Sequence, residues 1–313
     1  MTGKVVVIGG ANLDIRAVSA EPLIEGTSNP GRVRIMPGGV ARNIAEHLAR
    51  LGVDTALISA VGDDPAGHQI LAQSVAAGVD ITGVSIVSSP TGIYSAILDH
   101  DGNLATAVNA MAIIEAITPE QVLAHRGKLQ AADFIIVDCN LGAGTLKRLA
   151  GFARERGKRL IVDPVSVPKC LKLEAMLEVA PLFAATPNRA QAEKLTGHSC
   201  ATPQMAERAA QDLRDRGIGL VVLHLDRDGV LVLDASEGAP KSEVIPLQAR
   251  NDAPRDVTGG GDAAIAGLVY ALVHGQPATA AARIGQIAAA SVLESADGRI
   301  EVGAVREAAG QDR

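Results

Sequence analysis

The chain has 313 residues, of which 47% are hydrophobic and 20% are charged, a composition typical of a globular protein with a large core. Its net charge of −6 at pH 7 provides no basic field for nucleic acid or a membrane surface, although a single small phosphate-bearing molecule stays compatible. The three cysteines are far apart and match neither a zinc-finger spacing nor a disulfide framework, so we expect a reducing compartment.

The first predicted element is a strand over residues 5–8. It begins too early to leave room for a signal peptide, and no apolar run is long enough to span a bilayer, so we expect a cytoplasmic protein. Asn12 and Asp14 follow this strand, at the edge where α/β sheets bind ligands. Their side chains suit vicinal hydroxyl groups, but taken alone they are equally typical of a polar turn.

Short β-branched runs then alternate with helical patterns. Further strands are expected at residues 56–61, 134–137, 160–162, 220–225 and 230–233. Helices are expected at residues 42–51, 65–77, 119–130, 145–156, 205–216 and 263–274, most of which end before a glycine. This alternation predicts one α/β domain over residues 1–313, in which a mostly parallel sheet lies between two layers of helices.

Two segments, residues 15–36 and 91–108, interrupt the alternation. Both have strand-like content, polar turns and no helical period, and the second indicates a hairpin around Asp101 and Gly102. We expect the two segments to form one small β-sheet that projects from the main domain and covers a site as a lid. Two ordinary surface loops are the alternative.

A pair of glycines, Gly38 and Gly39, precedes the helix expected at residues 42–51. Paired glycines before a helix allow a ligand to approach the backbone closely. Asn43 falls on the first turn of that helix, so its side chain is expected near the same ligand. A plain loop that enters a helix would not need all three residues together.

The most informative motif is Asp256-Val-Thr-Gly-Gly-Gly-Asp262. Its three glycines let the chain turn, and the free N–H groups of a helix that should begin near Asp262 point to the same place, which makes an anion site. A carboxylate beside that site repels an anion, but it can take a proton from a hydroxyl group that attacks a phosphate. The motif therefore predicts a kinase site.

These motifs resemble the two signatures of the ribokinase-like (PfkB) family of carbohydrate and nucleoside kinases. The glycine pair with Asn43 matches the first signature, and the segment from Asp256 to Asp262 matches the second. Two further segments match the family in the same order along the chain, Ser59-Ala-Val-Gly-Asp63 and Thr186-Pro-Asn188, so the resemblance runs over nearly the whole chain. It implies a three-layer α/β/α domain with a small β lid, and ATP with Mg²⁺ as cofactors.

One branch of the family is particularly similar. Short segments of pseudouridine kinases resemble this chain at Ser28-Asn-Pro-Gly31, at Asn109 with Met111, at Asp138-Cys-Asn140 and at residues 162–170. This subgroup resemblance implies that ATP phosphorylates the ribose 5′-hydroxyl of pseudouridine.

The resemblance also implies roles for the acceptor half of the site. Asp262 resembles the general base, and the anion hole for the transferring phosphoryl group corresponds to Gly259, Gly260 and Gly261. Asp14, Gly39 and Asn43 would hold the ribose, with Asn12 and Gly38 beside them. Lys169 is a candidate for contact with the base, although a solvated surface lysine is equally consistent.

The nucleotide half follows from the same resemblance. Asn188 would face the nucleotide phosphates and the water shell of Mg²⁺, and the nucleotide loop begins at Leu225 and ends at Gly229, next to the anion hole at Gly261. Asp256 and Thr258 resemble the monovalent-cation site of the family, where K⁺ would organise the loop.

Three residues depart from the family pattern. Gln191 replaces a glutamate that helps to hold the hydration shell of the metal, so we expect weaker Mg²⁺ binding. Asp226 replaces a glycine and would repel ATP phosphates unless it turned outward or paired with Arg227. Ala110 stands where the pseudouridine subgroup often has aspartate. The base and the anion hole are intact.

Two other functions stay open. A nucleoside-binding protein that has lost efficient catalysis would explain Gln191 and Asp226. A kinase of another acceptor, such as ribose or a fructose phosphate, would use the same base, and a phosphorylated acceptor would need added cations near the lid, for which Arg32 and Arg34 are candidates. An exposed apolar lid face would favour a homodimer.

Overall fold

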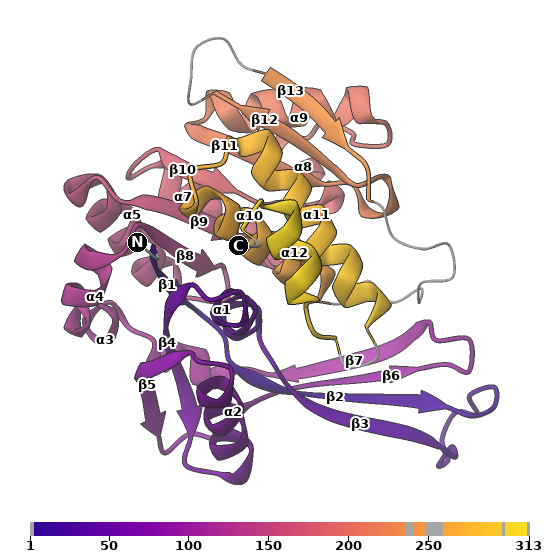
Figure 1. The fold of residues 1–313 in the computed structure, drawn as a ribbon. Helices are drawn as coiled ribbons and strands as arrows, with labels where there is room; N and C mark the ends of the chain where they lie inside the picture. Colours follow the sequence, from indigo (N-terminus) through magenta and orange to yellow (C-terminus); the bar gives the residue numbers. More distant parts are fainter. Residues whose placement is uncertain (1–2, 236–240, 248–258, 296–297, 312–313) are drawn as a thin grey trace.

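The computed structural model describes residues 3–235, 241–247, 259–295 and 298–311. Within these residues the larger sheet has nine strands in the order β13-β12-β11-β10-β9-β8-β1-β4-β5 (Figure 1). The strands from β11 to β5 are parallel, and β12 and β13 are antiparallel to their neighbours. The bounds are β1 (Lys4–Ile8), β4 (Asp54–Gly62), β5 (Asp80–Val87), β8 (Phe134–Asp138), β9 (Arg159–Asp163), β10 (Leu182–Ala185), β11 (Ile218–His224), β12 (Val230–Asp234) and β13 (Lys241–Ile245).

Helices cover both faces of this sheet, as the alternation of elements predicts. One cluster of buried side chains joins the sheet to α1 (Val40–Arg50), α10 (Gly260–Val273), α11 (Ala278–Glu294) and α12 (Val302–Ala308). A second cluster joins the other face to α3 (Pro119–Ala124), α4 (Arg126–Ala131), α5 (Ala143–Arg156), α7 (Lys172–Leu177), α8 (Arg189–Thr196) and α9 (Pro203–Asp215). The central strands are buried on both faces, which explains their unbroken apolar runs.

A second, four-stranded sheet has the order β3-β2-β6-β7 and projects from the central domain (Figure 1). It contains β2 (Asn12–Ser19), β3 (Gly31–Gly38), β6 (Gly92–Leu98) and β7 (Leu104–Ala110). The expected small sheet is therefore confirmed, and its strands extend beyond the expected bounds of 15–36 and 91–108. As a result Asn12 and Gly38 belong to this sheet. Helix α2 (Pro65–Ala76) packs between it and β5.

Several elements differ from the sequence expectation. The helix expected at residues 119–130 is two short helices that meet at His125. Four of the expected helices begin two or three residues earlier than expected, because a proline, a glycine or the residue after a glycine pair already belongs to the first turn. Among the described residues, no helix has the length and apolar character needed to cross a membrane.

Candidate active site

The first turn of α10 forms the centre of the site. Its N-cap, Gly259, has a φ of 84°, a left-handed conformation that favours glycine. The helix begins at Gly260 rather than near Asp262, so Asp262 is the third helical residue. The N–H groups of a first turn have no acceptor within their own helix, and those of Gly260 and Gly261 can therefore bind an anion.

Asp262 is held by a residue from another element. The Nδ2 atom of Asn43, in α1, donates to Oδ2 of Asp262 at 2.8 Å, so two residues 219 positions apart meet at the site. Burial raises the pKa of Asp262 to about 8, the Asn43 bond opposes that shift, and the carboxylates of Asp163, Asp138 and Asp14 add to it. A carboxyl group with a raised pKa binds a proton firmly once it has accepted one, which suits a general base.

A buried carboxylate organises the loops around this pair. Asp138 is the last residue of β8 and is 1% exposed. Its Oδ2 accepts from the backbone N–H of Gly10 at 2.8 Å and of Ala41 at 3.2 Å, and its Oδ1 accepts from Asn140 N–H at 2.9 Å. Asp138 thus connects the turn after β1, the first turn of α1 and the turn after β8. Burial raises the pKa of Asp138.

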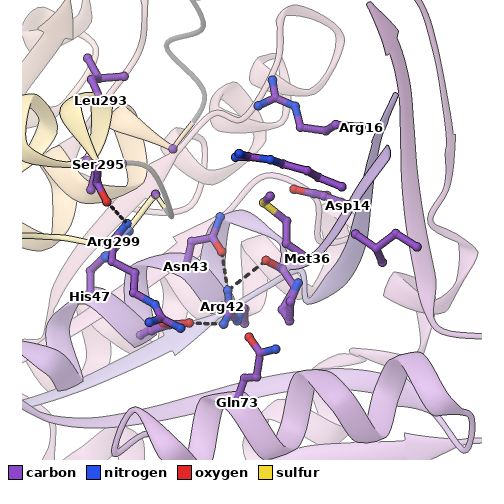
Figure 2. A pocket seen from close by; sticks show the side chains of 17 residues that line it. Asp14, Arg16, Met36, Arg42, Asn43, His47, Gln73, Leu293, Ser295 and Arg299 are labelled. Carbon is purple, nitrogen blue, oxygen red and sulfur yellow. Dashed lines mark hydrogen bonds and ion pairs between the residues drawn. The ribbon is translucent and has the colours of Figure 1, made fainter. Parts of the chain in front are cut away.

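A cavity of about 630 Å³, here called the sheet cavity, lies between the second sheet, α1 and the end of α11 (Figure 2). Charged and polar side chains line it, including Asp14, Arg16, Arg34, Arg42, Asn43 and Arg299. Met36 and Leu293 add apolar surface. The cavity therefore offers both hydrogen-bonding groups and apolar walls to a ligand.

Of the remaining acceptor-side candidates, Asn12 and Gly38 lie against Asp14, and neither they nor Gly39 line the sheet cavity. Asn12 donates from Nδ2 to Oδ1 of Asp14 at 2.6 Å. Gly38 pairs with Asn12 in the sheet, and a Cβ atom there would lie 2.3 Å from Oδ2 of Asp14. Gly39 is the N-cap of α1. Burial, the main cause, raises the pKa of Asp14.

A second cavity of about 330 Å³, here called the α10 cleft, is lined by Asp262. The first turn of α10, Asn188, Gly229 and Asp163 line it. Gly259 and Leu293 line both the sheet cavity and the α10 cleft, so the two spaces adjoin there. Asp262 lines the α10 cleft, and its hydrogen-bond partner Asn43 lines the sheet cavity, so the pair connects the two spaces.

Asn188 and Gln191 form a reciprocal cap at the start of α8. Oδ1 of Asn188 accepts from Gln191 N–H at 3.0 Å, and Oε1 of Gln191 accepts from Asn188 N–H at 2.9 Å. Gln191 is 4% exposed and lines the α10 cleft. The amide thus keeps the capping function that a glutamate would have, without the charge.

The nucleotide loop is a tight turn. Leu225 N–H donates to the Gly229 carbonyl at 2.8 Å, and Leu225 is fully buried, so only Gly229 of this pair lines the α10 cleft. Asp226 also lines the cleft, but its Oδ2 lies 3.5 Å from Nε of Arg189, in α8. The exposed side chain of Asp226 agrees with the expected outward orientation, and a pair with Arg189 takes the place of the expected pair with Arg227.

Lys169 is neither a solvated surface lysine nor a residue that lines either of the two cavities. It is half-buried, and its Nζ donates to Oδ1 of Asn140 at 2.6 Å. Burial lowers the pKa of Lys169. Because Asn140 is also tied to Asp138, Lys169 belongs to the network behind the turn after β8.

Two candidate residues lie outside the described part of the chain, and the structure adds two carboxylates to the site. Asp256 and Thr258 fall outside the described residues, so the monovalent-cation site stays a prediction. Asp163, at the end of β9, was not among the candidates, yet it lines the α10 cleft, and burial raises its pKa to about 7. Asp138 was noted only as part of a motif. Both come directly after a strand predicted from the sequence, at residues 134–137 and 160–162, which is the one signal that could have identified them.

The geometry agrees with comparisons to known proteins. A family model described as pfkB family carbohydrate kinase matches residues 2–302. The chain belongs to the PfkB family of carbohydrate kinases. A pseudouridine kinase of Escherichia coli (strain K12) is 36% identical over 90% of this chain and 88% of its own length. A guanosine-inosine kinase of Exiguobacterium acetylicum is 26% identical over 94% and 95% of the two chains.

A solved structure shows the same fold. Ribokinase of Arabidopsis thaliana, described as a complex with ribose and ATP, superposes with a TM-score of 0.84 at 21% identity, covering 99% of both chains. The ribokinase-like fold expected from the sequence is therefore confirmed. As a PfkB kinase, the protein is a phosphotransferase that acts on a hydroxyl group, and kinases of this family use ATP with a divalent metal such as Mg²⁺.

Proposed function

We propose that this PfkB kinase transfers the γ-phosphoryl group of ATP to the ribose 5′-hydroxyl of pseudouridine. The observation that carries the proposal is the contact between Asp262, which lines the α10 cleft on the first turn of α10, and Asn43, which lines the sheet cavity. The acceptor would occupy the sheet cavity, and the phosphates would lie in the cleft. The similarity to pseudouridine kinase of Escherichia coli supports the choice of acceptor.

The size of the sheet cavity favours a nucleoside over a free sugar. At about 630 Å³ it has room for a base in addition to a ribose. In the second sheet, Asn109 pairs with Tyr94, and Tyr94 pairs with Asp14, so the three side chains share one face. Asn109 therefore lies two strands from Asp14 on the same face of the sheet, where its amide would be available to an acceptor longer than a pentose.

In the reaction, Asp14 and Asn43 would bind the ribose hydroxyls and direct the 5′-hydroxyl to Asp262. Asp262 removes its proton as the oxygen attacks the γ-phosphorus, and the bond to the bridging oxygen of ATP breaks to release ADP. The N–H groups of Gly260 and Gly261 stabilise the charge on the transferring phosphoryl oxygens. The second sheet would exclude water from the sheet cavity.

The residues of the α10 cleft fit a metal–nucleotide complex. A deep cleft that combines the start of a 14-residue helix with amide and carboxylate side chains suits phosphates with a hydrated cation. Asn188 and Gln191 would hold that hydration shell, and Mg²⁺ would neutralise phosphate charge. Because Gln191 is uncharged, we expect weak Mg²⁺ affinity. We also propose K⁺ at Asp256 and Thr258.

Other acceptors are the second candidate. The similarity to a guanosine-inosine kinase extends over nearly the whole chain, so another nucleoside is consistent with the fold and the base. Arg34 lines the sheet cavity, which would also suit a phosphorylated sugar, whereas Arg32 is not part of the lining. Weak catalysis by a nucleoside-binding protein would follow if Gln191 could not hold the metal.

A coupled ADP-release assay tests these alternatives with pseudouridine, uridine, guanosine, inosine, ribose and fructose phosphates as acceptors. We expect the highest kcat/KM for pseudouridine, well above uridine, and Asp262→Asn should lower turnover by about 10²–10⁴-fold, the usual contribution of a positioned base. Equal or absent turnover with every acceptor would overturn the proposal. Calorimetric titration with ATP, with and without Mg²⁺, then tests the alternative of a nucleoside-binding protein without catalysis. Absence of ATP binding would favour that alternative.

We further propose that the second sheet pairs with a second copy of the chain. Val33, Ile97 and Val108 lie on the face opposite Asp14, because strand residues alternate, and they are 61%, 41% and 68% exposed. An exposed apolar sheet face is typical of a protein–protein contact. A homodimer through this face would cover it.

A further inference from the structure

The guanidinium group of Arg42, in α1, lies beside the proposed catalytic pair. Arg42 is 5% exposed, and its Nη1 donates to Oδ1 of Asn43 at 2.9 Å and to the Pro37 carbonyl at 3.1 Å. Its Nη2 donates to Glu46 (Figure 2, dashed lines). The same arginine therefore contacts the strand end of the second sheet, the asparagine that reaches Asp262, and a buried carboxylate.

These contacts fix the orientation of the Asn43 side chain. The two ends of an amide differ, because Oδ1 only accepts hydrogen bonds and Nδ2 only donates them. Arg42 can only donate, so Oδ1 of Asn43 faces Arg42 and Nδ2 faces Asp262 at 2.8 Å. If the amide turned over, two donors would face each other at Arg42, and Oδ1 would face the Asp262 carboxylate.

Arg42 is itself held in place by a charged partner. Glu46 is 8% exposed, and while one of its oxygens accepts from Arg42, the other accepts from Nε of Arg50 at 2.9 Å. Removing charges from water is costly, so a buried ion pair adds little net stability. An apolar pair would pack α1 as well, but it would leave the Asn43 amide free to turn over.

We propose that Arg42 is a positioning residue, whose guanidinium fixes the orientation of the Asn43 amide and, through it, the carboxylate of Asp262. This inference rests on the proposed role of Asp262 as the general base. It predicts that Arg42 contributes to turnover only while Asn43 is present. It also predicts a minor effect on ATP binding, because Arg42 does not line the α10 cleft.

A double-mutant cycle tests the dependence on Asn43. Loss of a hydrogen bond to a charged group predicts that Arg42→Met lowers kcat about tenfold, with the KM for ATP unchanged. In the Asn43→Ala background, Arg42→Met should change kcat less than about twofold, since coupled effects are not additive. An equal decrease in both backgrounds would overturn the inference. Arg42→Lys keeps a buried charge and takes the place of Arg42→Met if that variant does not fold.

Arg50→Met is the matched control. It removes the other partner of Glu46 and leaves the contact between Arg42 and Asn43 intact. We expect its kcat to stay within about twofold of the parent, because Glu46 still accepts from Arg42 and Arg42 still donates to Asn43. If Arg50→Met lowered kcat as much as Arg42→Met, the helix as a whole and not the amide orientation would be responsible.

The pH dependence of kcat gives a second readout. Besides Asn43, the described groups that act on Asp262 are the carboxylates of Asp14, Asp138 and Asp163, which all disfavour its ionisation. His47, near Arg42 on α1, has a pKa lowered to about 4 by burial and stays neutral.

Because the Asn43 amide favours the ionised form of Asp262, its loss should move the rise of kcat to higher pH in Arg42→Met. An unshifted profile would contradict the inference. Full activity of Asp262→Asn would instead contradict the proposed function, so the two failures can be told apart.

Discussion

At the scale of single residues, Asp262 combines two requirements that conflict. It must lie close to an anion site to serve as a base, yet burial and the carboxylates of Asp163, Asp138 and Asp14 make its ionised form unfavourable. Only the Asn43 amide among its described side-chain partners opposes that effect. Ionisation of Asp262 therefore destabilises the folded protein when no ligand is bound.

This destabilisation predicts that removing the Asp262 carboxylate raises the stability of the protein while it lowers activity. The pKa of Asp262 is about 8 in the folded protein, above its ordinary value of 3.8, so the folded state binds a proton that the unfolded state lacks, and stability falls as pH rises through this range. Asp262→Asn cannot ionise. Its Tm should therefore exceed that of the parent, with a larger difference at pH 8.5 than at pH 5, measured by calorimetry without ligands. A difference that shrinks with rising pH would contradict the prediction.

The residues of the site were predictable only in part. Asp262, Asn43, Asp14 and the glycines occur in short motifs whose chemistry can be interpreted locally, and the structure brings them together. Asp138 and Asp163 end neighbouring parallel strands, and only the strand order places them beside α10, more than 90 residues further along the chain. The contact of Arg42 with Asn43 depends on side-chain orientation, which a sequence pattern does not determine.

At the scale of elements, the junction between β3 and α1 positions the acceptor half of the site. β3 ends at Gly38, which pairs with Asn12 at the start of β2, and α1 begins two residues later. Asp14 packs against the backbone of Gly38, so the position of the carboxylate depends on the absence of a side chain there. The register of two strands thereby determines the position of the carboxylate that is proposed to bind a ribose hydroxyl.

Gly38→Ala tests this dependence. A Cβ atom at Gly38 would lie 2.3 Å from Oδ2 of Asp14, so the carboxylate must move. Overpacking of this kind costs about 1–3 kcal/mol, which predicts a KM for the acceptor raised by about 5- to 150-fold and an unchanged KM for ATP. Gly127→Ala is the control, since a Cβ atom there meets no described atom within 4 Å. Equal KM values for the acceptor in both variants would refute the role of Gly38.

Elements with a clear hydrophobic pattern in the sequence were predictable, and elements without such a pattern were not. Strands such as β1, β8 and β9 form unbroken apolar runs, and these were identified. β5 was missed because its residues are mostly half-buried, β10 because it has four residues, and α11 because its alanines suit a core as well as a surface. Tertiary packing rather than local preference decides such segments.

At the scale of the whole molecule, the second sheet presents one face to the site and an apolar face to solvent. Val33→Asp places a charge on the apolar face, and we expect it to convert a dimer to a monomer in light scattering coupled to size-exclusion chromatography, because an unpaired charge in an apolar contact is costly. Glu25→Gln, on the β2–β3 loop outside this face, should leave the mass unchanged. A parent protein that is monomeric at high concentration would rule out the proposed dimer.

Asp14, the carboxylate proposed to bind the acceptor, belongs to the projecting sheet, whereas Asn43 and Asp262 belong to the central domain. Recognition and chemistry are thus encoded in separate modules of one polypeptide. Substitutions on the four strands of the second sheet can change which alcohol is accepted without altering the residues proposed for phosphoryl transfer. This separation gives a physical reason why one fold accommodates many different sugars and nucleosides.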